Sequence, residues 1–361
     1  MRQLTFIKPG VFEWHDVAPP ALAADTDAIV RPLAVARCDL DLYIAVGIVA
    51  YPGPFAFGHE AIAEVIDAGP KSNVRPGDKV VVPFQLSCGR CDNCKRGFTN
   101  TCGAFAPRAA YGLKPTSGVE YGGALSERMR VPFADHMLVG LPDGLDPIDV
   151  ASTPDNVPDG WRAVAPHLKA RPGASVLVVG GVAQSVGIYA AGAAKALGAG
   201  RVLYLDDDPV RRAAAASLGA TAEPMNLKER RGKSAIAAGG SPLNAKSTEE
   251  QFDITVDASG NPEALDFVIT STAPTGVCTS VAIYLSATPM PLTRMYGKGI
   301  TFITGRVHAR ANLPDVLHAC AHGHFHPGKV NARIIPFTQA AEAMTDSSPK
   351  LVFTNDLQPA R

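Results

Sequence analysis

The sequence has no excess of charge of either sign and no long hydrophobic run. Lys and Arg together number 34, as do Asp and Glu, so the formal net charge is +0 at pH 7. This balance excludes the electrostatic footprint of a protein that binds nucleic acid or an anionic membrane. The longest apolar runs, such as 174–181, are too short to span a bilayer. At the N-terminus Lys8, Pro9 and Glu13 interrupt any signal-peptide core, so we expect a cytoplasmic protein with a small-molecule ligand.

Cysteine is also scarce, and its distribution is uneven. Of the seven cysteines, four fall within residues 88–102 and the other three stand apart. A secreted disulfide scaffold is shorter and has denser, usually paired cysteines. The pattern therefore predicts reduced, metal-binding thiols.

The four clustered cysteines have the spacing Cys88-x2-Cys91-x2-Cys94-x7-Cys102. Two-residue gaps let neighbouring thiolates face one ion, and four thiolates fill the tetrahedral shell of zinc. Such a site leaves no open position, so it would stabilise a lobe at about 86–104 and perform no chemistry. An iron–sulfur cluster is the alternative, because evenly spaced cysteines also suit one.

The length of 361 residues favours two domains. The first part of the chain is rich in Pro and Gly and has short strand patterns, which predict a β-rich domain. Those runs are 28–33, 61–67 and 79–83. A strand at 174–179, a helix at 186–197 and a strand at 201–205 then form a βαβ unit.

The alternation of helix and strand continues and predicts a doubly wound parallel sheet, so the fold class is α/β. The further elements are a helix at 211–218, a strand at 253–257, a helix at 262–271 and a strand at 276–284. Residues 220–250 are polar and predict a loop with at most one helix. A helix at 314–322, a strand at 333–336 and a short helix at 339–345 are expected to pack on the first domain.

A glycine turn follows the first strand of this βαβ unit. It reads Gly180-Gly-Val-Ala-Gln-Ser-Val-Gly187, so a middle glycine is missing from the usual dinucleotide-binding turn. Asp206 ends the next strand, where a carboxylate accepts ribose hydroxyls and repels a 2′-phosphate, which favours NAD over NADP. Asp207 and Asp208 add to that repulsion, whereas Arg211 and Arg212 temper it. The expected cofactor residues are Gly180, Gly181, Ala183, Gln184, Ser185, Val186, Gly187 and Asp206, with the pyrophosphate at the helix start.

Three isolated residues are candidates for a second metal site. Cys38, His59 and Asp155 would each, if taken alone, more often be structural. Their order along the chain nevertheless resembles the zinc-containing medium-chain dehydrogenase/reductase family of the alcohol dehydrogenase type. The resemblance rests on Cys38 followed by Asp41, Gly58-His59-Glu60, Pro76-Gly77-Asp78-Lys79-Val80, the clustered cysteines and the βαβ unit.

The resemblance implies a fold and two zinc ions per chain. It implies a GroES-like catalytic domain at 1–156 and 303–361, and an NAD-binding Rossmann domain at 157–302. Cys38, His59 and Asp155 would hold a catalytic zinc with a fourth, open position, and Asp159 is the competing third ligand. Asp41 would hold His59, and Glu60 would approach the metal during ligand exchange.

The implied reaction is reversible oxidation of a primary or secondary alcohol to an aldehyde or ketone, through a zinc-bound alkoxide that passes hydride to NAD. An aldehyde dismutase belongs to the same class. A nucleotide-binding protein with structural zinc and little catalysis is the alternative, and a homodimer or homotetramer is expected. One residue departs from the family: Leu40 replaces the Ser or Thr that starts the proton relay. Tyr43, near the family's downstream His, or a chain of waters would have to replace that hydroxyl.

Overall fold

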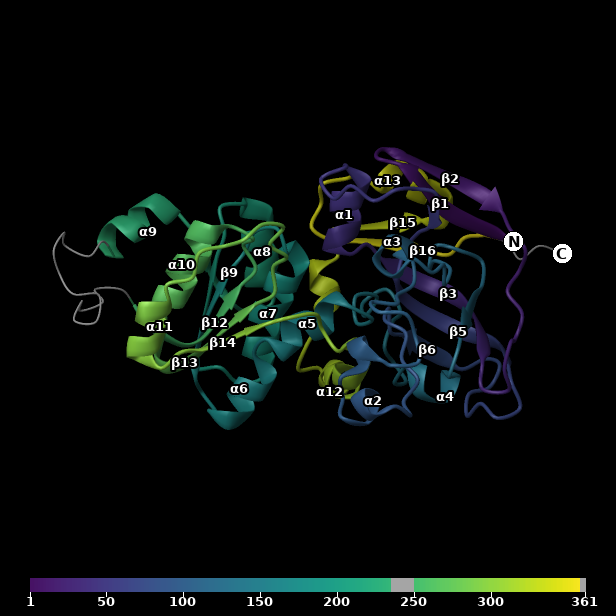
Figure 1. The fold of residues 1–361 in the computed structure, drawn as a ribbon, viewed down its shortest axis with the longest axis horizontal. Helices are drawn as coiled ribbons and strands as arrows, with labels where there is room; N and C mark the ends of the chain where they lie inside the picture. Colours follow the sequence, from purple (N-terminus) through teal and green to yellow (C-terminus); the bar gives the residue numbers. More distant parts are fainter. Residues whose placement is uncertain (235–249, 358–361) are drawn as a thin grey trace. The chain divides into compact units, whose positions relative to one another are not determined.

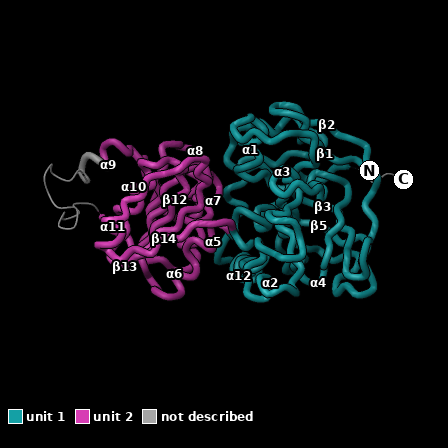
Figure 2. The backbone as a smooth tube through the Cα atoms, in the orientation of Figure 1, with its two compact units in different colours: residues 1–158, 307–361 teal, residues 159–306 magenta. Residues whose placement is uncertain are grey.

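The computed structural model describes residues 1–234 and 250–357. The chain divides into two compact units, Met1–Pro158 with Val307–Arg361, and Asp159–Arg306 (Figure 2). Among the described residues, no helix combines the length and apolar character needed to cross a membrane. The cytoplasmic location stays a prediction.

The first unit is built on β-structure that is antiparallel except for the parallel pair β15 and β16 (Figure 1). Its seven-stranded sheet has the order β15-β16-β3-β5-β6-β8, with β7 paired to β3, and a smaller sheet has the order β2-β1-β4. The strands are β1 (Arg2–Lys8), β2 (Val11–Asp16), β3 (Ala28–Ala36), β4 (Phe55–Ala56), β5 (Glu60–Ala68), β6 (Lys79–Val82), β7 (Met129–Val131), β8 (Val139–Gly140), β15 (Arg333–Pro336) and β16 (Leu351–Thr354). The core of this unit includes Phe6, Phe57 and Val80, all within 1% of full burial.

Short helices lie between these strands. They are α1 (Asp39–Ala45), α2 (Asp92–Lys95), η1 (Thr99–Thr101), α3 (Lys114–Ser117), α4 (Ala134–Met137), α12 (Ala309–Ala321), η2 (Pro327–Val330), η3 (Phe337–Gln339) and α13 (Ala340–Ala343), and α5 (Asn156–Arg162) starts in this unit. The register of β3 against β5 pairs Ala36 with Glu60. Residues that follow β3 therefore lie beside residues that precede β5.

The second unit is a six-stranded sheet in the order β11-β10-β9-β12-β13-β14, and every neighbouring pair in it is parallel. The strands are β9 (Ser175–Val179), β10 (Arg201–Leu205), β11 (Thr221–Glu223), β12 (Phe252–Asp257), β13 (Thr272–Ser280) and β14 (Thr301–Thr304). The helices are α6 (Ala165–Ala170), α7 (Gln184–Ala196), α8 (Pro209–Ser217), α9 (Leu227–Ser234), α10 (Pro262–Thr270) and α11 (Leu292–Lys298). Helices lie on both sides of the strands (Figure 1), which is why β9 and β10 are apolar along nearly their whole length. The predicted α/β class is confirmed.

Three local predictions were wrong. The helix expected from Pro314 is α12, which begins at Ala309, because the buried residues Ala309, Leu313 and Leu317 extend its apolar face towards the N-terminus. Pro314 lies inside the helix, where its missing N–H removes one backbone hydrogen bond. The strand expected at 276–284 is β13, which runs from Thr272 to Ser280.

The third wrong prediction concerns the polar segment 220–250, which contains a strand, β11, as well as helix α9. Residues 235–249 of that segment lie outside the described residues. The short strand β11 pairs with β10 at the edge of the sheet, so its few residues carry little apolar signal.

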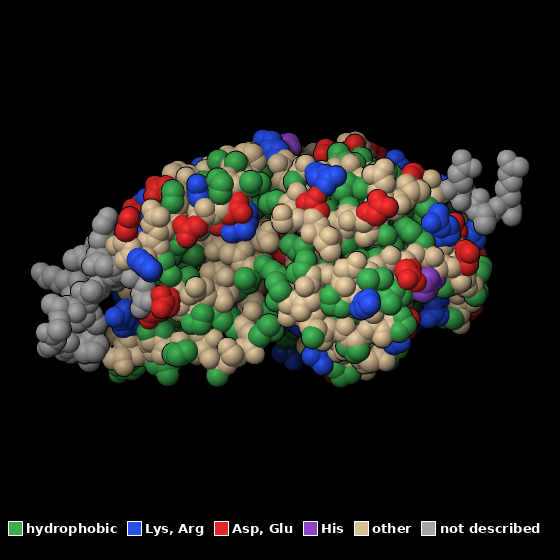
Figure 3. Space-filling view, turned by 90° about the horizontal axis from the view of Figure 1, so that it is seen from above, with side chains coloured by type: hydrophobic (Ala, Val, Ile, Leu, Met, Phe, Trp, Pro, Cys, Tyr) green, Lys and Arg blue, Asp and Glu red, His purple; other side chains and the backbone are tan. Residues whose placement is uncertain are grey.

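Acidic and basic side chains alternate on the face drawn in Figure 3, separated by hydrophobic and neutral ones. That face has no broad region of a single sign, in keeping with the balanced composition.

Candidate functional site

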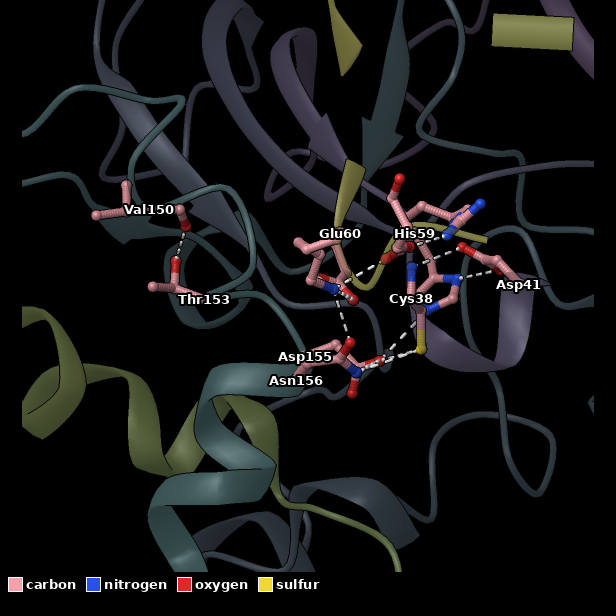
Figure 4. Close-up of polar contacts among 11 residues, drawn as sticks. Cys38, Asp41, His59, Glu60, Val150, Thr153, Asp155 and Asn156 are labelled. Carbon is pink, nitrogen blue, oxygen red and sulfur yellow. Dashed lines mark hydrogen bonds and ion pairs between the residues drawn. The ribbon is translucent and has the colours of Figure 1, made fainter. Parts of the chain in front are cut away.

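Three of the predicted ligands meet in the first unit. Cys38 Sγ lies 3.2 Å from Asp155 Oδ2, and His59 Nε2 lies 3.3 Å from the same oxygen (Figure 4). With Glu60 they form a group whose possible ligand atoms all lie within 4.8 Å of one another. All four residues are buried. We call this group the Cys38 cluster.

The fold explains how distant residues reach one place. Because Ala36 on β3 pairs with Glu60 on β5, Cys38 and His59 flank the same end of that ladder. Cys38 is the N-cap of α1, and Asp155 comes directly before α5. The two helix starts and the strand pair thus bring the three side chains together.

Asp41 lies beside His59. Asp41 Oδ1 lies 3.3 Å from His59 Nδ1, and Asp41 Oδ2 accepts a hydrogen bond from the Cys38 backbone N–H at 3.1 Å. Burial lowers the pKa of His59, but the charge of Asp41 and the bond to Asp155 outweigh it and raise that pKa well above 6.5. Because Nδ1 of the ring faces Asp41, Nε2 faces Cys38 and Asp155, the direction in which a metal would lie.

The donor set fits zinc. A thiol, an imidazole and a carboxylate are zinc ligands, and three protein ligands leave one coordination position open. Burial is the main cause that raises the pKa of the Cys38 thiol, and nearby Asp155 adds to it. A cation bound among these buried acidic groups would offset the cost of ionising them, because buried like charges repel one another unless they are compensated.

The competing ligand Asp159 lies elsewhere. Its carboxylate accepts a hydrogen bond from Arg162 at 2.6 Å, within the second unit, and it is not part of the Cys38 cluster. Asp155 is therefore the better third ligand.

A buried ion pair next to the Cys38 cluster was not foreseen. Lys350, which is 0% exposed, places Nζ 3.2 Å and 3.3 Å from the two carboxylate oxygens of Glu60. Nζ also donates to the Arg37 carbonyl at 2.9 Å and to Asn156 Oδ1 at 2.8 Å. Burial raises the pKa of Glu60 to about 8, although the charge of Lys350 opposes that rise. The signal in the sequence is a lysine directly before the apolar run of β16.

Leu40 and Tyr43 lie on α1. Leu40 is partly buried against the hydrophobic core of the first unit. Tyr43 is half-buried, and its carbonyl accepts a hydrogen bond from Val49 N–H at 3.1 Å. Neither residue belongs to the Cys38 cluster.

The four remaining predicted ligands form a second group, the Cys88 lobe (Cys88, Cys91, Cys94 and Cys102), whose sulfurs lie within 4.8 Å of one another. Backbone N–H groups donate to these sulfurs: Cys91 N–H to Cys88 Sγ at 3.4 Å, and Cys88 N–H to Cys102 Sγ at 3.3 Å. Hydrogen bonds from the backbone lower the pKa of Cys91 to about 6. The geometry suits one ion held by four thiolates.

The glycine turn before α7 is shaped by close approaches. A Cβ on Gly180 would lie 2.3 Å from both Asp206 Oδ2 and the Tyr204 hydroxyl, and one on Gly181 would lie 2.5 Å from the Ser259 carbonyl oxygen. The N–H groups of Val182 and Ala183 donate to the carbonyls of Ser259 and Ala258, respectively. The turn is thereby bound to the end of β12 without the middle glycine.

Helix α7 begins at Gln184, so Gln184, Ser185 and Val186 form its first turn and direct their N–H groups along the helix axis. The N–H of Gly187 donates to the Ala183 carbonyl at 3.0 Å and starts the helical ladder.

Asp206 is 2% exposed and is already surrounded by donors. Arg211 donates to both carboxylate oxygens at 2.7 Å, the Tyr204 hydroxyl donates at 2.8 Å, and the Asp208 N–H donates at 2.9 Å. Burial lowers the pKa of Arg211, but the bonds to Asp206 reverse this and raise it above its usual value. A ribose hydroxyl could bind Asp206 only by displacing one of these donors.

Comparison with known proteins agrees with both units. Residues 24–143 match the alcohol dehydrogenase GroES-like domain, and residues 185–322 match the zinc-binding dehydrogenase domain. A medium chain reductase/dehydrogenase of an Acremonium species is 31% identical over 82% of this chain and 98% of the relative.

Two further proteins match almost the whole chain. A probable zinc-binding alcohol dehydrogenase of Mycobacterium tuberculosis is 26% identical over 95% of this chain and 84% of the relative. The structure of an alcohol dehydrogenase from Thermus sp. ATN1 superposes with a TM-score of 0.84 at 27% identity, covering 98% of this chain and 100% of that one. The chain belongs to the zinc-dependent medium-chain dehydrogenase/reductase family, as the sequence motifs predicted.

Proposed function

We propose that this protein catalyses reversible hydride transfer between a primary or secondary alcohol and NAD, with the Cys38 cluster as its catalytic zinc site. The observation that carries the proposal is that Cys38 Sγ and His59 Nε2 lie 3.2 Å and 3.3 Å, respectively, from Asp155 Oδ2 in a buried site. Zinc held there acts as a Lewis acid that lowers the pKa of the substrate hydroxyl and polarises the carbonyl of the product. We assign catalysis to the first unit and cofactor binding to the second.

The residues around the metal have separate tasks. Cys38, His59 and Asp155 hold the ion, and Asp41 fixes the imidazole of His59 so that Nε2 is the metal-binding atom. Glu60 is restrained by Lys350 and is the group close enough to exchange with a departing ligand. The Cys88 lobe holds the second zinc, which is structural.

The proton of the alcohol must leave by a route that does not begin at residue 40. Leu40 has no group that can accept or donate a proton. We assign the route to ordered water or to the hydroxyl of Tyr43, which lies on the same helix, α1. This departure from the family favours a substrate range different from that of simple alcohols.

The glycine turn and the start of α7 would receive the pyrophosphate of the cofactor. The three successive carboxylates Asp206, Asp207 and Asp208 favour NAD, since negative charge repels a 2′-phosphate. The Asp206–Arg211 pair reduces that selectivity, because its carboxylate is neutralised within the chain.

We also propose a homo-oligomer, formed in the first instance as a dimer. β14 ends the second unit's sheet and therefore offers unpaired backbone groups. Nearby exposed apolar residues support association: Ile283, Leu285, Leu292 and Tyr296 are 62–86% exposed.

Metal analysis tests the catalytic site. We expect two zinc ions per chain, falling to one in Cys38→Ala and in Asp155→Ala. Asp159→Ala is the matched control and should keep two, because Asp159 lies outside the cluster. If Cys38→Ala keeps the same zinc content as the parent, the assignment of the Cys38 cluster as the catalytic zinc site is wrong.

Activity distinguishes the enzyme from the second candidate, a nucleotide-binding protein with structural zinc. Leu40 and the altered glycine turn favour that second candidate. A screen of alcohols and aldehydes that follows NADH absorbance should find turnover that is lost in Asp155→Ala. Conversion of an aldehyde into equal amounts of its alcohol and its acid, without net formation of NADH, would identify a dismutase. Cofactor binding without any turnover would support the second candidate.

A further inference from the structure

One amide side chain contacts Cys38 and Asp155 of the Cys38 cluster and also Lys350, which pairs with Glu60. Asn156 Nδ2 donates to Cys38 Sγ at 3.3 Å and to Asp155 Oδ2 at 3.1 Å. Asn156 Oδ1 accepts a hydrogen bond from Lys350 Nζ at 2.8 Å. The residue is 3% exposed, and Figure 4 shows it beside Asp155 with its contacts to Cys38.

The chemistry of its neighbours fixes which way this amide faces. A lysine ammonium can only donate hydrogen bonds, so the oxygen of Asn156 must face Lys350. The NH2 group is then turned to the sulfur and the carboxylate oxygen, which both act as acceptors when they are ligands. Each end of the amide therefore meets the partner that it requires.

The amide also joins charges of opposite sign. Lys350 is positive, and a thiolate and a carboxylate that hold a metal are both negative. A hydrogen bond at Oδ1 from a cation polarises the amide and strengthens the bonds donated by Nδ2. Hydrogen bonds to a ligating sulfur or carboxylate fix the direction in which that ligand faces the metal, and metal affinity falls when they are removed. At the Cys88 lobe backbone N–H groups donate to the sulfurs, whereas here a side chain does so.

We propose that Asn156 is a positioning residue for the catalytic zinc, which holds Cys38 and Asp155 at their spacing and transmits the charge of Lys350 to both ligands. This inference rests on the zinc site proposed above. It assigns to Lys350 a second task besides pairing with Glu60. It also makes residues 156 and 350 part of the metal site, although neither binds the metal.

Cadmium NMR of the full chain tests the proposal, because a four-thiolate site and a one-thiolate site give well-separated signals. Asn156→Leu keeps the size and removes every polar contact. Asn156→Asp keeps the shape and the acceptor that faces Lys350, but it offers no N–H to the ligands. Asn355→Leu is the matched control, since Asn355 donates to the Pro32 carbonyl at 2.8 Å and its other hydrogen bonds join it to Leu33 and Leu357, none of which belongs to the Cys38 cluster.

We expect both Asn156 variants to shift the cadmium signal of the one-thiolate site, the Cys38 cluster. The signal of the four-thiolate site, the Cys88 lobe, should stay unchanged. Zinc at the Cys38 cluster should bind roughly 10- to 100-fold more weakly, measured by transfer to a chelator, as is typical when a group behind a ligand is removed. Asn355→Leu should change neither quantity.

The outcomes separate the two proposals. If the parent gives no one-thiolate signal, the zinc site itself is wrong and this inference falls with it. If the parent gives the signal but both Asn156 variants match Asn355→Leu in signal and zinc affinity, the role of Asn156 is overturned while the zinc site stands. The cadmium signal of the Cys88 lobe reports whether the first unit is folded. If Asn156→Leu loses that signal, the result for Asn156→Asp decides whether Asn156 has the proposed role.

Discussion

At the scale of single residues, Leu40 stands where the family resemblance leads us to expect a Ser or Thr hydroxyl. The side chain packs against the core of the first unit and can transfer no proton. In the proposed reaction, the proton of the alcohol would therefore have to leave through other groups, and the pH dependence of turnover should reveal the change.

Replacing Leu40 with Ser should restore a hydroxyl at the start of a relay. We expect kcat for a simple alcohol to rise roughly 100-fold, the low end of general acid–base effects, and its pH profile to change. Leu40→Ala is the control, because it removes the same bulk without adding a hydroxyl. Equal rates and pH profiles in both variants would show that the relay is not limiting.

Arg211 should control the choice between NAD and NADP. Arg211→Ala frees the carboxylate of Asp206 to accept ribose hydroxyls and removes a positive charge that attracts a 2′-phosphate. Since a hydrogen bond to a charged group is worth about 1.5–3 kcal/mol, the ratio of kcat/KM for NAD over NADP should rise at least roughly tenfold. Arg212→Ala is the control, because Arg212 donates to the backbone carbonyl of Asp206 and not to its carboxylate. An unchanged ratio in Arg211→Ala would contradict this role.

The residues of the proposed zinc site and the neighbouring Asp41 could be predicted from the sequence, but the contacts of Lys350 could not. Cys38, His59 and Asp155 stand in a family order, and Asp41 follows Cys38 closely in the chain. Lys350 lies 290 residues from Glu60, and only the register of β16 against β3 brings the two together. Sequence spacing carries no information about such a contact.

At the scale of elements, the start of β12 is fixed by one carboxylate. Asp253 accepts hydrogen bonds from the N–H of Ser175 at 2.9 Å, from its hydroxyl at 2.8 Å and from Arg171 at 2.7 Å. These contacts tie β12 to β9, whose C-terminal end leads into the glycine turn. The bond from the Ser175 N–H is the main cause that lowers the pKa of Asp253 below 3.8.

Asp253→Asn should lower the free energy of unfolding by about 1 kcal/mol near neutral pH, a value reduced because the site is partly exposed. The pKa is lower in the folded state, so the stabilisation is present above about pH 4 and is lost as the pH falls through the folded-state pKa. Denaturant titrations of parent and variant at several pH values measure this. A difference that stays the same down to the most acidic pH would contradict the ionic origin of the effect.

Long, strongly patterned elements were predicted well, whereas edges and helix starts were not. β9, α7 and β10 follow from an apolar run, an alanine-rich stretch and a second apolar run. The prediction for α12 started at Pro314, but the helix begins at Ala309, and Ala309 and Leu313 are buried in it. Packing, which the local sequence does not show, decided the boundary.

At the scale of the whole molecule, the two groups of metal ligands lie in one unit and the glycine turn lies in the other. Metal binding and cofactor binding can therefore be perturbed separately. The Cys88 lobe should matter for stability and not directly for the chemistry.

Cys91→Ser should reduce the zinc content from two ions per chain to one and lower the thermal midpoint. For units of this size each kcal/mol lost lowers the midpoint by about 2–4 °C. Cys320→Ser is the control: Cys320 is buried in the same unit but outside the lobe, so its loss should cost stability without any change in zinc content. Retention of both zinc ions in Cys91→Ser would mean that the lobe does not hold one.

The position of Lys350 has a consequence for how the protein is made. The ribosome completes Cys38, His59, Glu60 and Asp155 long before it reaches Lys350, which is 194 residues beyond Asn156. Until β16 joins β3, Glu60 lacks the ammonium group of Lys350, and the amide of Asn156 lacks the same cation behind it. The proposed zinc site would therefore reach its final electrostatic form only after Lys350 has been made, and a chain cut short before β16 should hold zinc less tightly even though every proposed ligand is present.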